Sequence, residues 1–593
     1  MQPTSPETAY LKSDWFLATA ILIVAVIVFW LSPVRQITDS KYSMLLSQDL
    51  LKFRSFDLKH YAISDAEVKE HTQLLKVGDH IYYYPPAGGP VLSVPFVAVM
   101  NALGVNAANP DGTYRLRGEI AMQAILAPLL MGLLASIFFL TARLILPITW
   151  SVLIALGGAF GTQVWSTASR ALWSHTWEIL LLGVAIWLLL AAETGRQKLR
   201  PILLATVLSW TYFSRPTATI PILAITIYMI LSRRRWFWPY AITGAIWAAL
   251  FGLYSWIHFR HYLPNYYREN VIFSNPWLIL RGSLFSPARG LFIYVPVTLV
   301  VFYLIARFRK DITLPRMTWL SLGVVLGHLL VLTSLQTWWG GGCYGARLTT
   351  DLVPWFVLLA ILGVSAMLKW RERIGVAWSR PALVVPLALG AVLLAFSVFA
   401  NARGAIAIET AKWEDWRWQR PPLERDTSAF WNWRYPQFMA GLIRPPIPET
   451  FPVLNAPIEM GDVESGKFIW YGWSGPETPT RWTDGREAAV IFSLGATSNF
   501  NLEMIVAPFV AGDLQEQVVN TYLNDQLIGQ LDLVGAETRA VSLLVPRDLI
   551  RDNNVLRFQL LNATSPLAVG FGDDERLLGM KVTRIGFRPA ANK

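Results

Sequence analysis

The sequence predicts a polytopic α-helical membrane protein with a β-sandwich domain at its C-terminal end. Hydrophobic residues make up 54% of the 593 residues and charged residues only 15%, against about a quarter in ordinary soluble domains. Apolar runs long enough to cross a bilayer recur up to about Ala400. Beyond that point, short segments of alternating polarity replace them, as in β-strands that are buried on one face.

The apolar runs predict about eleven transmembrane helices. The first run is long for a signal peptide and has neither a basic segment before it nor a clear cleavage site, so we expect an uncleaved helix. The fifth and sixth runs are short and closely joined. The predicted spans lie near 15–31, 120–141, 149–166, 177–192, 201–213, 217–231, 240–257, 291–306, 317–335, 352–368 and 382–400.

The charges of the connecting loops predict the orientation. One alternating set of loops is basic, and the positive-inside bias makes that set cytoplasmic. We therefore expect a protein of the plasma or inner membrane with its N-terminus in the cytoplasm. The loop 32–119 and everything after residue 400 then lie outside. The basic set contains Arg143, Arg196, Lys198, Arg200, Arg233, Arg234, Arg235, Arg307, Arg309, Lys310, Arg316, Lys369, Arg371, Arg373 and Arg380.

The external loop 32–119 contains two predicted interfacial helices. In "YSMLLSQDLLKF", the apolar residues recur at helical spacing on one face, which suits a helix lying on the membrane surface. Farther on, "IYYYPPAGGPVLSVPFVAVMNALG" contains an apolar stretch of about 13 residues, too short to span a bilayer. This loop and the spans together form the predicted membrane domain, residues 1–404.

A Trp- and Pro-rich connector, 405–457, leads to a predicted β-sandwich domain at 458–593. About seven short strands separated by turn residues predict the sandwich, and Asn524-Asp525 is a plausible hairpin turn. This domain could bind glycan through Trp470, Trp473 and Trp482, or it could simply cover the membrane domain. The predicted strands are "AAVIFSL", "FNLEMIVAPF", "QVVNTYL", "QLIGQLDL", "RAVSLLVP", "VLRFQLL" and "GMKVTRIGF".

Three carboxylates of the external region are candidate catalytic residues. Asp39 stands directly before the first interfacial helix, where it could cap that helix or act as a general base for an acceptor hydroxyl. Asp57 follows the same helix, and Glu119 begins the second span. Each of the latter two is also well explained as an ordinary interfacial charge. Two carboxylates at one site would let their pKa values separate.

Several arginines on the predicted outer side run against the positive-inside bias. Snorkelling to the interface would explain any one of them. As a group they suit a lipid phosphate, because the planar guanidinium grips phosphate with a fork of donors. Arg170 and the nearby His175 border apolar sequence, where charge is costly. The arginines are Arg170, Arg215, Arg281, Arg289 and Arg347.

Other classes of site receive little support from the composition. The chain has one cysteine, Cys343, so neither an intrachain disulfide nor a zinc site built from cysteine pairs can form. The net charge is +11, but no basic stripe is interleaved with stacking aromatic residues, so nucleic acid is not an expected partner. The seven histidines lack paired ligand spacing. No cofactor is expected, with a divalent ion left open, and His328 is expected to be a packing residue.

Three motifs resemble the GT-C superfamily of polyprenyl-phosphate-sugar glycosyltransferases, in particular its protein O-mannosyltransferase and lipid A aminoarabinose transferase branches. "TDSKYSMLLSQDLL" matches their acidic loop opening, and "YYYPPAGGPVLSVPF" their Pro-Pro segment. "WWGGGCYGARLTTDLVPW" matches an outer W-G-G…Y-G-x-R segment. The resemblance covers about residues 15–400. It implies Asp39 as the catalytic aspartate, with Tyr83, Tyr84, Tyr344 and Arg347 among the substrate-binding residues.

The sequence departs from this family at two positions. Ser40 stands where many members have a second acid, and Tyr84 precedes the prolines where some members place a phosphate-binding lysine. The resemblance implies transfer of a sugar from a polyprenyl-phosphate donor to a hydroxyl of a glycan, lipid or protein acceptor, with inversion. The alternatives are a transporter or flippase of a lipid-linked glycan, which would usually need a polar path through the midplane, and a receptor or scaffold.

Overall fold

The computed structural model describes residues 6–268, 275–335, 337–413, 428–445, 447, 450–453, 457–495, 498–572, 574 and 576–590. The chain forms two compact units. The first contains residues 1–411 and 430–441, and the second contains residues 412–429 and 442–593. The predicted connector therefore contributes to both units, and its residues 414–427 lie outside the described residues.

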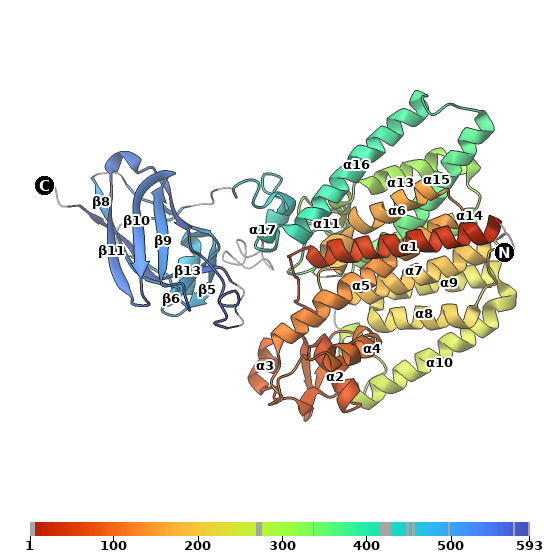
Figure 1. Ribbon diagram of the computed structural model, residues 1–593, viewed down its shortest axis with the longest axis horizontal. Helices are drawn as coiled ribbons and strands as arrows, with labels where there is room; N and C mark the ends of the chain where they lie inside the picture. Colours follow the sequence, from red (N-terminus) through yellow and green to blue (C-terminus); the bar gives the residue numbers. More distant parts are fainter. Residues whose placement is uncertain are drawn as a thin grey trace, which may run out of the picture. The chain divides into compact units, whose positions relative to one another are not determined.

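All eleven predicted spans are helices in the first unit, packed side by side (Figure 1). Seven of the described helices are long and apolar enough to cross a membrane: α1, α5, α7, α10, α14, α15 and α16. The other four are shorter. The eleven helices are α1 (Pro6–Leu31), α5 (Leu116–Arg143), α6 (Ile148–Phe160), α7 (Ser174–Glu193), α8 (Pro201–Ser214), α9 (Thr219–Ser232), α10 (Arg234–Phe259), α13 (Val297–Arg307), α14 (Pro315–Leu332), α15 (Val353–Ile374) and α16 (Pro381–Ile406).

The burial of these helices is that of a membrane protein. In α5, α7 and α15, most of the apolar window is buried inside the bundle, whereas in α10 and α16 only 11% of it is. The outward faces of α10 and α16 present large apolar side chains such as Leu253, Trp256, Leu389 and Val392. A soluble monomer rarely exposes contiguous apolar surface of this extent, so the chain is a multi-pass membrane protein.

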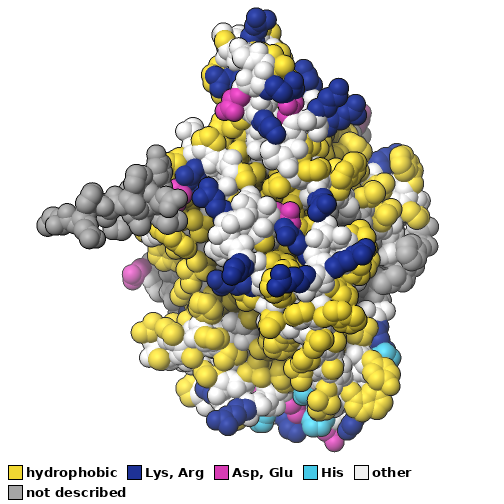
Figure 2. All heavy atoms as spheres, turned by 90° about the vertical axis from the view of Figure 1, so that its right-hand side faces the viewer, with side chains coloured by type: hydrophobic (Ala, Val, Ile, Leu, Met, Phe, Trp, Pro, Cys, Tyr) yellow, Lys and Arg dark blue, Asp and Glu magenta, His cyan; other side chains and the backbone are white. Residues whose placement is uncertain are grey.

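Basic side chains gather at one end of the bundle. Figure 2 looks at the end where the N-terminus lies and shows many Lys and Arg side chains among apolar ones, with few Asp or Glu. Ion pairs join the predicted cytoplasmic loops there. Arg143 at the end of α5 pairs with Asp14 of α1 at 2.8 Å, and Arg373 at the end of α15 pairs with Asp311 before α14, also at 2.8 Å. This sidedness is what the loop charges predict.

The loop between α1 and α5 folds into a small substructure at the other ends of these helices. It contains α2 (Ser43–Lys52), η1 (Leu58–His60), α3 (Asp65–Glu70), the antiparallel pair β1 (Leu74–Val77) and β2 (His80–Tyr83), and α4 (Gly88–Ala102). Gly88 lets α4 begin against α8, because a Cβ there would lie 2.4 Å from the backbone carbonyl carbon of Phe213.

Both predicted interfacial helices are present, but α2 is not a surface helix. Its residues from Ser43 to Asp49 are all buried, including the polar Gln48 and Asp49. It packs against α4 and α5, and only its last turn is exposed. The amphipathic pattern predicted the helix correctly, but not the partners that cover its polar face.

The second unit is a β-sandwich. Its sheets have the strand orders β10-β9-β12-β7-β4 and β11-β8-β13-β6-β5, with β3 paired to β13. Their inner faces pack together, for example Phe492 of β7 against Phe587 of β13 with ring centroids 4.4 Å apart. The strands are β3 (Ile458–Glu459), β4 (Ile469–Tyr471), β5 (Trp473–Glu477), β6 (Thr480–Asp484), β7 (Glu487–Ser493), β8 (Phe500–Pro508), β9 (Glu516–Leu523), β10 (Gln526–Val534), β11 (Arg539–Val545), β12 (Asn553–Leu560) and β13 (Leu578–Pro589).

The seven predicted strands are β7 to β13, and Asn524-Asp525 forms the turn between β9 and β10 with positive φ at both residues. The suggestion that Trp470, Trp473 and Trp482 form a glycan-stacking surface is wrong for the first two. Trp470 and Trp473 are buried in the domain, so their rings are not open to a ligand. They form part of the packing of this domain.

Candidate functional site

Asp39 and Arg347, which are 308 residues apart, form an ion pair in the first unit. An Nη2 proton of Arg347 is donated to Oδ2 of Asp39. The Asp39 side chain is 52% exposed, whereas that of Arg347 is 8% exposed. The structure therefore brings together the catalytic aspartate and the W-G-G…Y-G-x-R arginine of the family resemblance, with the carboxylate open to solvent and the guanidinium held by the protein.

Arg347 is fixed by its surroundings. It begins η6 (Arg347–Leu352), the short helix that leads into α15. Its Nη1 donates to the carbonyl of Gly340 at 2.8 Å, and its guanidinium lies 3.7 Å from the ring centroid of Trp173. The flat contact with Trp173 is a cation–π interaction, which strengthens where water is excluded. Its Nε is buried without a hydrogen-bond partner among the described residues.

The backbone beside Asp39 is held from two directions. The Tyr83 hydroxyl donates to the carbonyl of Asp39 at 3.1 Å. On the other side, Ser40 Oγ donates to Oε1 of Gln123 at 2.8 Å, and Nε2 of Gln123 donates to the Ser40 carbonyl at 2.9 Å. The same Oε1 accepts the backbone N–H of Leu172 at 2.8 Å, next to Trp173. One amide of α5 thus joins both halves of the ion-pair site.

Tyr266 and Tyr84 complete the aromatic surroundings. Tyr266 lies in η4 (Asn265–Tyr267) after α10, and its ring centroid is 5.5 Å from that of Tyr84. Burial raises the pKa of the Tyr266 phenol, and the charges of Arg215, Asp39 and Arg347 act on it. The site therefore consists of one carboxylate, one guanidinium and a set of aromatic rings, a combination suited to a sugar attached to an anionic group.

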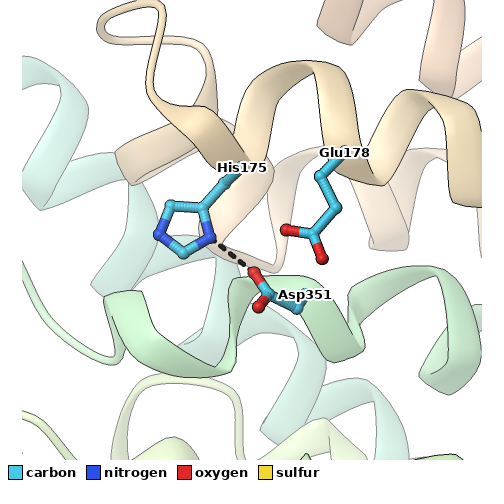
Figure 3. A group of neighbouring side chains, drawn as sticks. All are labelled: His175, Glu178 and Asp351. Atoms are coloured by element: carbon cyan, nitrogen blue, oxygen red, sulfur yellow. Dashed lines mark hydrogen bonds and ion pairs between the residues drawn. The ribbon is translucent and has the colours of Figure 1, made fainter. Parts of the chain in front are cut away.

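A second cluster of charges lies beneath this site, fully buried. His175 and Glu178, on adjacent turns of α7, both point toward Asp351 of η6 (Figure 3). His175 Nδ1 lies 2.5 Å from Asp351 Oδ1. Asp351 Oδ2 accepts Nε–H of Arg215 at 2.9 Å and the hydroxyl of Thr217 at 2.7 Å. Asp351 thus accepts hydrogen bonds from α7 and from the segment that contains Arg215 and Thr217.

The residues of this cluster do not favour a metal ion. One ligand atom each from His175, Glu178 and Asp351 lies within 4.8 Å of the others, a spacing that could hold an ion. However, Arg215 Nε is 2.9 Å from Asp351 and 3.2 Å from Glu178. The guanidinium therefore already supplies the positive charge between the carboxylates, and a divalent ion would have to displace it.

Asp351 connects the buried cluster to η6, the short helix that presents Arg347. Asp351 lies one turn after Arg347 in η6, so the bonds from His175, Arg215 and Thr217 fix the helix that presents Arg347. Gln163 adds two further bonds, from its Nε2 to the Ala346 carbonyl at 3.1 Å and to Thr349 Oγ1 at 3.0 Å. The predicted ligand residues His175 and Arg215 thus hold η6, and the structure does not bring them into contact with Asp39.

Arg170, Arg289 and Tyr344 make contacts within the protein. Arg170 is buried and donates to the carbonyls of Phe29 and Ser32 at the end of α1, which satisfies the free carbonyls of a helix terminus. Arg289 donates to the Trp339 carbonyl at 2.8 Å and to Gln437 Oε1 at 2.6 Å. The Tyr344 hydroxyl donates to the Ala400 carbonyl. Arg281 lies over the ring of Trp431.

Glu119 is buried against the start of α2. Its Oε1 accepts the N–H of Met44 at 2.9 Å and the hydroxyl of Ser43 at 3.1 Å, and its Oε2 accepts the N–H of Leu45 at 3.2 Å. These are N–H groups of the first turn, which have no partner within the helix, and a negative charge there is favourable. Glu119 of α5 therefore caps α2, the helix that follows Asp39.

We expect Glu119→Gln to loosen α2. The glutamine side chain places an NH2 donor near the backbone N–H groups of Met44 and Leu45, where Glu119 has an acceptor. Each charge-assisted hydrogen bond that is lost contributes about 1.5–3 kcal/mol. Hydrogen exchange of the α2 amides should accelerate by about tenfold or more. Glu67→Gln is the matched control, because Glu67 caps its own helix, α3. Unchanged exchange in α2 of the Glu119 variant would contradict the capping role.

Asp57 is also engaged within the external substructure. It lies 2.6 Å from His80 Nδ1 and 3.2 Å from Lys59 Nζ, and it accepts the N–H of Ile81 at 3.0 Å. Although burial opposes the shift, these bonds from His80, Ile81 and Lys59 lower the pKa of the Asp57 carboxyl. Neither Asp57 nor Glu119 is thus brought into contact with Asp39, and the role of second catalytic acid remains a sequence prediction for both.

Asp49, on the buried part of α2, makes the stability of this substructure dependent on pH. Burial raises the pKa of its carboxyl from 3.8 to about 6, against the opposing effect of His60 at 3.1 Å. Between about pH 4 and 6 the folded state therefore binds more protons than the unfolded state, and stability falls as pH rises through this window. The contribution of Asp57 has the opposite sign and is lost only below about pH 4.

We expect α2 to be less protected from hydrogen exchange at pH 7 than at pH 4.5, after correction for the intrinsic rate. The buried Asp49 carboxylate is charged at the higher pH, and its desolvation opposes folding. Asp49→Asn should weaken this dependence, so that the protection of α2 differs less between the two pH values than in the wild type. Protection that rises with pH in the wild-type protein would show that the Asp49 carboxyl does not control this helix.

Several residues of the site were not predicted from the sequence. Trp173 and Gln123 look like ordinary residues of apolar helices, and nothing in their local sequence shows that they meet Arg347 or Ser40. Tyr266 lies in the outer loop "NYYREN", and Asp351 ends "YGARLTTD". For Glu178 and Asp351, the usable signal was an acidic residue next to an apolar span, where a charge is costly unless it is paired.

Comparisons with known proteins find distant likenesses only. No protein-family model matches the sequence, and no curated protein matches it. One matching solved structure is a family 35 carbohydrate binding module from an environmental isolate, with 18% identity, a TM-score of 0.13, and coverage of 21% of this chain and 83% of the module. Another is the arabinosyltransferase EmbB from Mycobacterium smegmatis, with 12% identity and a TM-score of 0.40.

The EmbB match covers 99% of this chain and 65% of EmbB, so the chain spans somewhat less than two thirds of that protein's length. Neither TM-score is high enough to define a shared fold. The functional assignment therefore depends on the site itself.

Proposed function

We propose that the chain is an integral-membrane glycosyltransferase that transfers a sugar from a polyprenyl-phosphate donor to an acceptor hydroxyl. The observation that carries this proposal is the ion pair between a solvent-exposed carboxylate, Asp39, and a buried arginine, Arg347. It brings the acidic loop opening and the W-G-G…Y-G-x-R segment of the GT-C resemblance into one site. Aromatic side chains of Tyr83, Tyr266 and Trp173 surround the pair.

In the proposed reaction, Arg347 binds the donor phosphate and stabilises the negative charge that develops on it as it leaves. Asp39 takes the proton from the acceptor hydroxyl. The acceptor oxygen forms a bond to the anomeric carbon while the bond from that carbon to the phosphate oxygen breaks, and the phosphate keeps the electron pair. In-line displacement inverts the anomeric configuration. Holding donor and acceptor in this geometry supplies much of the acceleration.

The membrane setting of the proposal follows from the loop charges. With the basic end of the bundle in the cytoplasm, Asp39 and the substructure around α2 and α4 lie on the outer side of the cell membrane. A lipid-linked donor reaches that side from the bilayer. The acceptor is then an extracytoplasmic glycan, lipid or protein, and the β-sandwich is extracytoplasmic as well.

The rival function, a transporter or flippase of a lipid-linked glycan, also requires outer arginines. Such proteins usually need a polar path through the midplane. In the bundle, His175, Glu178, Arg215 and Asp351 form a buried charge cluster whose members pair with one another. This arrangement favours an enzyme with a rigid site over a moving conduit.

The test is an assay of the full chain, purified in lipid nanodiscs, with a panel of polyprenyl-phosphate sugars and extracts of envelope glycans as acceptors. We expect release of polyprenyl phosphate together with a glycosylated product. The same chain, reconstituted in vesicles with fluorescent lipid-linked sugar, provides the comparison. Translocation of the lipid without any sugar transfer across the panel would overturn the enzyme assignment in favour of the transporter.

A further inference from the structure

We infer that the donor phosphate displaces the Asp39 carboxylate from Arg347. The carboxylate then becomes free to act as a base only after the donor has bound. This inference rests on the proposed function and adds an order of events to it. It follows from the unequal way in which the two partners of the ion pair are held.

Arg347 is the fixed partner. Its guanidinium is held between the Gly340 carbonyl and the ring of Trp173, and its helix η6 is anchored through Asp351. It is buried, so it cannot follow a departing carboxylate into solvent. A ligand that needs this guanidinium must therefore come to it and replace Asp39 as its partner.

Asp39 is the exchangeable partner. Its side chain is half exposed, and its backbone is held on one side by Tyr83 and on the other by Ser40 and Gln123. Rotation about its side-chain bonds therefore moves the carboxylate without moving the chain. The groups that hold the backbone keep the released carboxylate next to the place where the donor binds.

The ion pair occupies groups that the proposed reaction uses. The Nη2 proton that Arg347 gives to Asp39 Oδ2 is not available to a phosphate, and that carboxylate oxygen is engaged until the pair opens. A phosphodiester carries one negative charge, so it replaces the carboxylate on the arginine without a change in the net charge of the pair. Arginine forms two parallel bonds to such a group, and the Nε of Arg347 still has a proton to donate.

A small cavity beside Arg347 offers further donors. Ser283, Arg289 and Trp338 contribute to its lining. The hydroxyl of Ser283, the indole N–H of Trp338 and the Nε of Arg347 are buried and lack hydrogen-bond partners within the described residues. Buried donors without partners are costly, so an oxygen-rich group that reaches them gains their bonds. The cavity itself, about 10 Å³, is smaller than a phosphate, so only the edge of a group bound at Arg347 reaches these donors.

The test is the affinity of nanodisc-embedded full-length variants for a long-chain polyprenyl phosphate, with the uncharged polyprenol as the reference ligand. Asp39→Asn removes the competitor from Arg347. We expect it to bind the phosphate about two- to fivefold more tightly than the wild type, the range that an exposed ion pair contributes, with the gain shrinking at high salt. Asp65→Asn is the matched control, because Asp65 is an exposed carboxylate of the same loop that pairs with Lys76. Its affinity should not change.

Arg347→Met separates exchange from simple charge repulsion. In this background, Asp39→Asn should no longer increase the affinity, because the arginine for which the two groups compete is gone. If Asp39→Asn increased the phosphate affinity equally with and without Arg347, or did not increase it at all, the exchange would be overturned. The proposed glycosyltransferase function would not be affected by that result. If the wild type bound polyprenyl phosphate no better than polyprenol, the proposed function would fall, and this inference with it.

Discussion

Replacing Asp39 by asparagine should lower the rate constant of sugar transfer by about 100- to 10,000-fold, the range that a positioned general base contributes. Asparagine has the size of aspartate but cannot accept the acceptor proton. Because the Asp39 side chain is half exposed and its backbone is held by bonds that do not involve the carboxylate, the variant should fold like the wild type. The measurements are single-turnover transfer from a polyprenyl-phosphate sugar and thermal unfolding in the same nanodiscs.

Asp79→Asn is the control for this variant, because Asp79 is another exposed carboxylate of the external loop, in the turn between β1 and β2. It should transfer sugar at the wild-type rate. Asp39→Glu keeps a carboxylate but lengthens the side chain, and it should recover part of the activity. Transfer by Asp39→Asn at the wild-type rate would remove Asp39 from the mechanism, even though it faces Arg347.

Replacing Asp351 by asparagine should destabilise the first unit most among the polar substitutions considered. Removing one partner of a buried ion pair leaves uncompensated charge, which typically costs about 3–5 kcal/mol. Here His175 is bonded to one carboxylate oxygen, and Arg215 and Thr217 to the other. Asparagine keeps one acceptor oxygen, so one side of this arrangement loses its acceptor and meets an NH2 group instead. Since Asp351 fixes η6, Arg347 should also lose its position, and transfer should fall in the molecules that remain folded. Thermal unfolding and donor affinity measure the two effects.

Asp311→Asn provides the matched comparison for Asp351→Asn. Asp311 also pairs with an arginine, but the Arg373 side chain is 54% exposed, so water screens the pair and replaces it readily. Its unfolding temperature should change much less, and its donor affinity not at all. If Asp351→Asn unfolded at the wild-type temperature, the buried cluster would not be the anchor of η6.

Most of the fold could be predicted from the sequence, because hydrophobic runs and alternation express it directly. The eleven apolar runs and the seven strands from β7 to β13 are where the patterns put them. The strands β5 and β6 were missed, since "WSGPETPTRWTDG" is rich in Pro and Gly and favours turns over strands. The short strands β3 and β4 were missed as well. The burial of α2 was missed for a different reason. Its polar residues Gln48 and Asp49 find partners in the distant Ala107 and His60, and no local pattern shows such partners.

The residues of the candidate site could be predicted from the sequence only where they belong to a motif of the family resemblance. Asp39 and Arg347 belong to motifs, and the structure brings them together. Arg215 was chosen as one of the outer arginines, and Arg170 and His175 also for the cost of placing charge next to apolar sequence. That cost is real, but the charges are satisfied by helix carbonyls and by Asp351 rather than by an open ligand site. Gln123 could not be found from sequence at all, because its importance lies in contacts with Ser40 and Leu172, 83 and 49 residues away.

The position of Cys343 gives the protein a built-in reporter. It is the sole cysteine of the chain, four residues before Arg347, and it is buried beside Trp339. A buried thiol reacts with a maleimide only when its segment opens. The labelling of the unmodified protein therefore reports how readily the segment just before Arg347 opens. It can be followed as a lipid-linked ligand is added, with no cysteine to be introduced or removed.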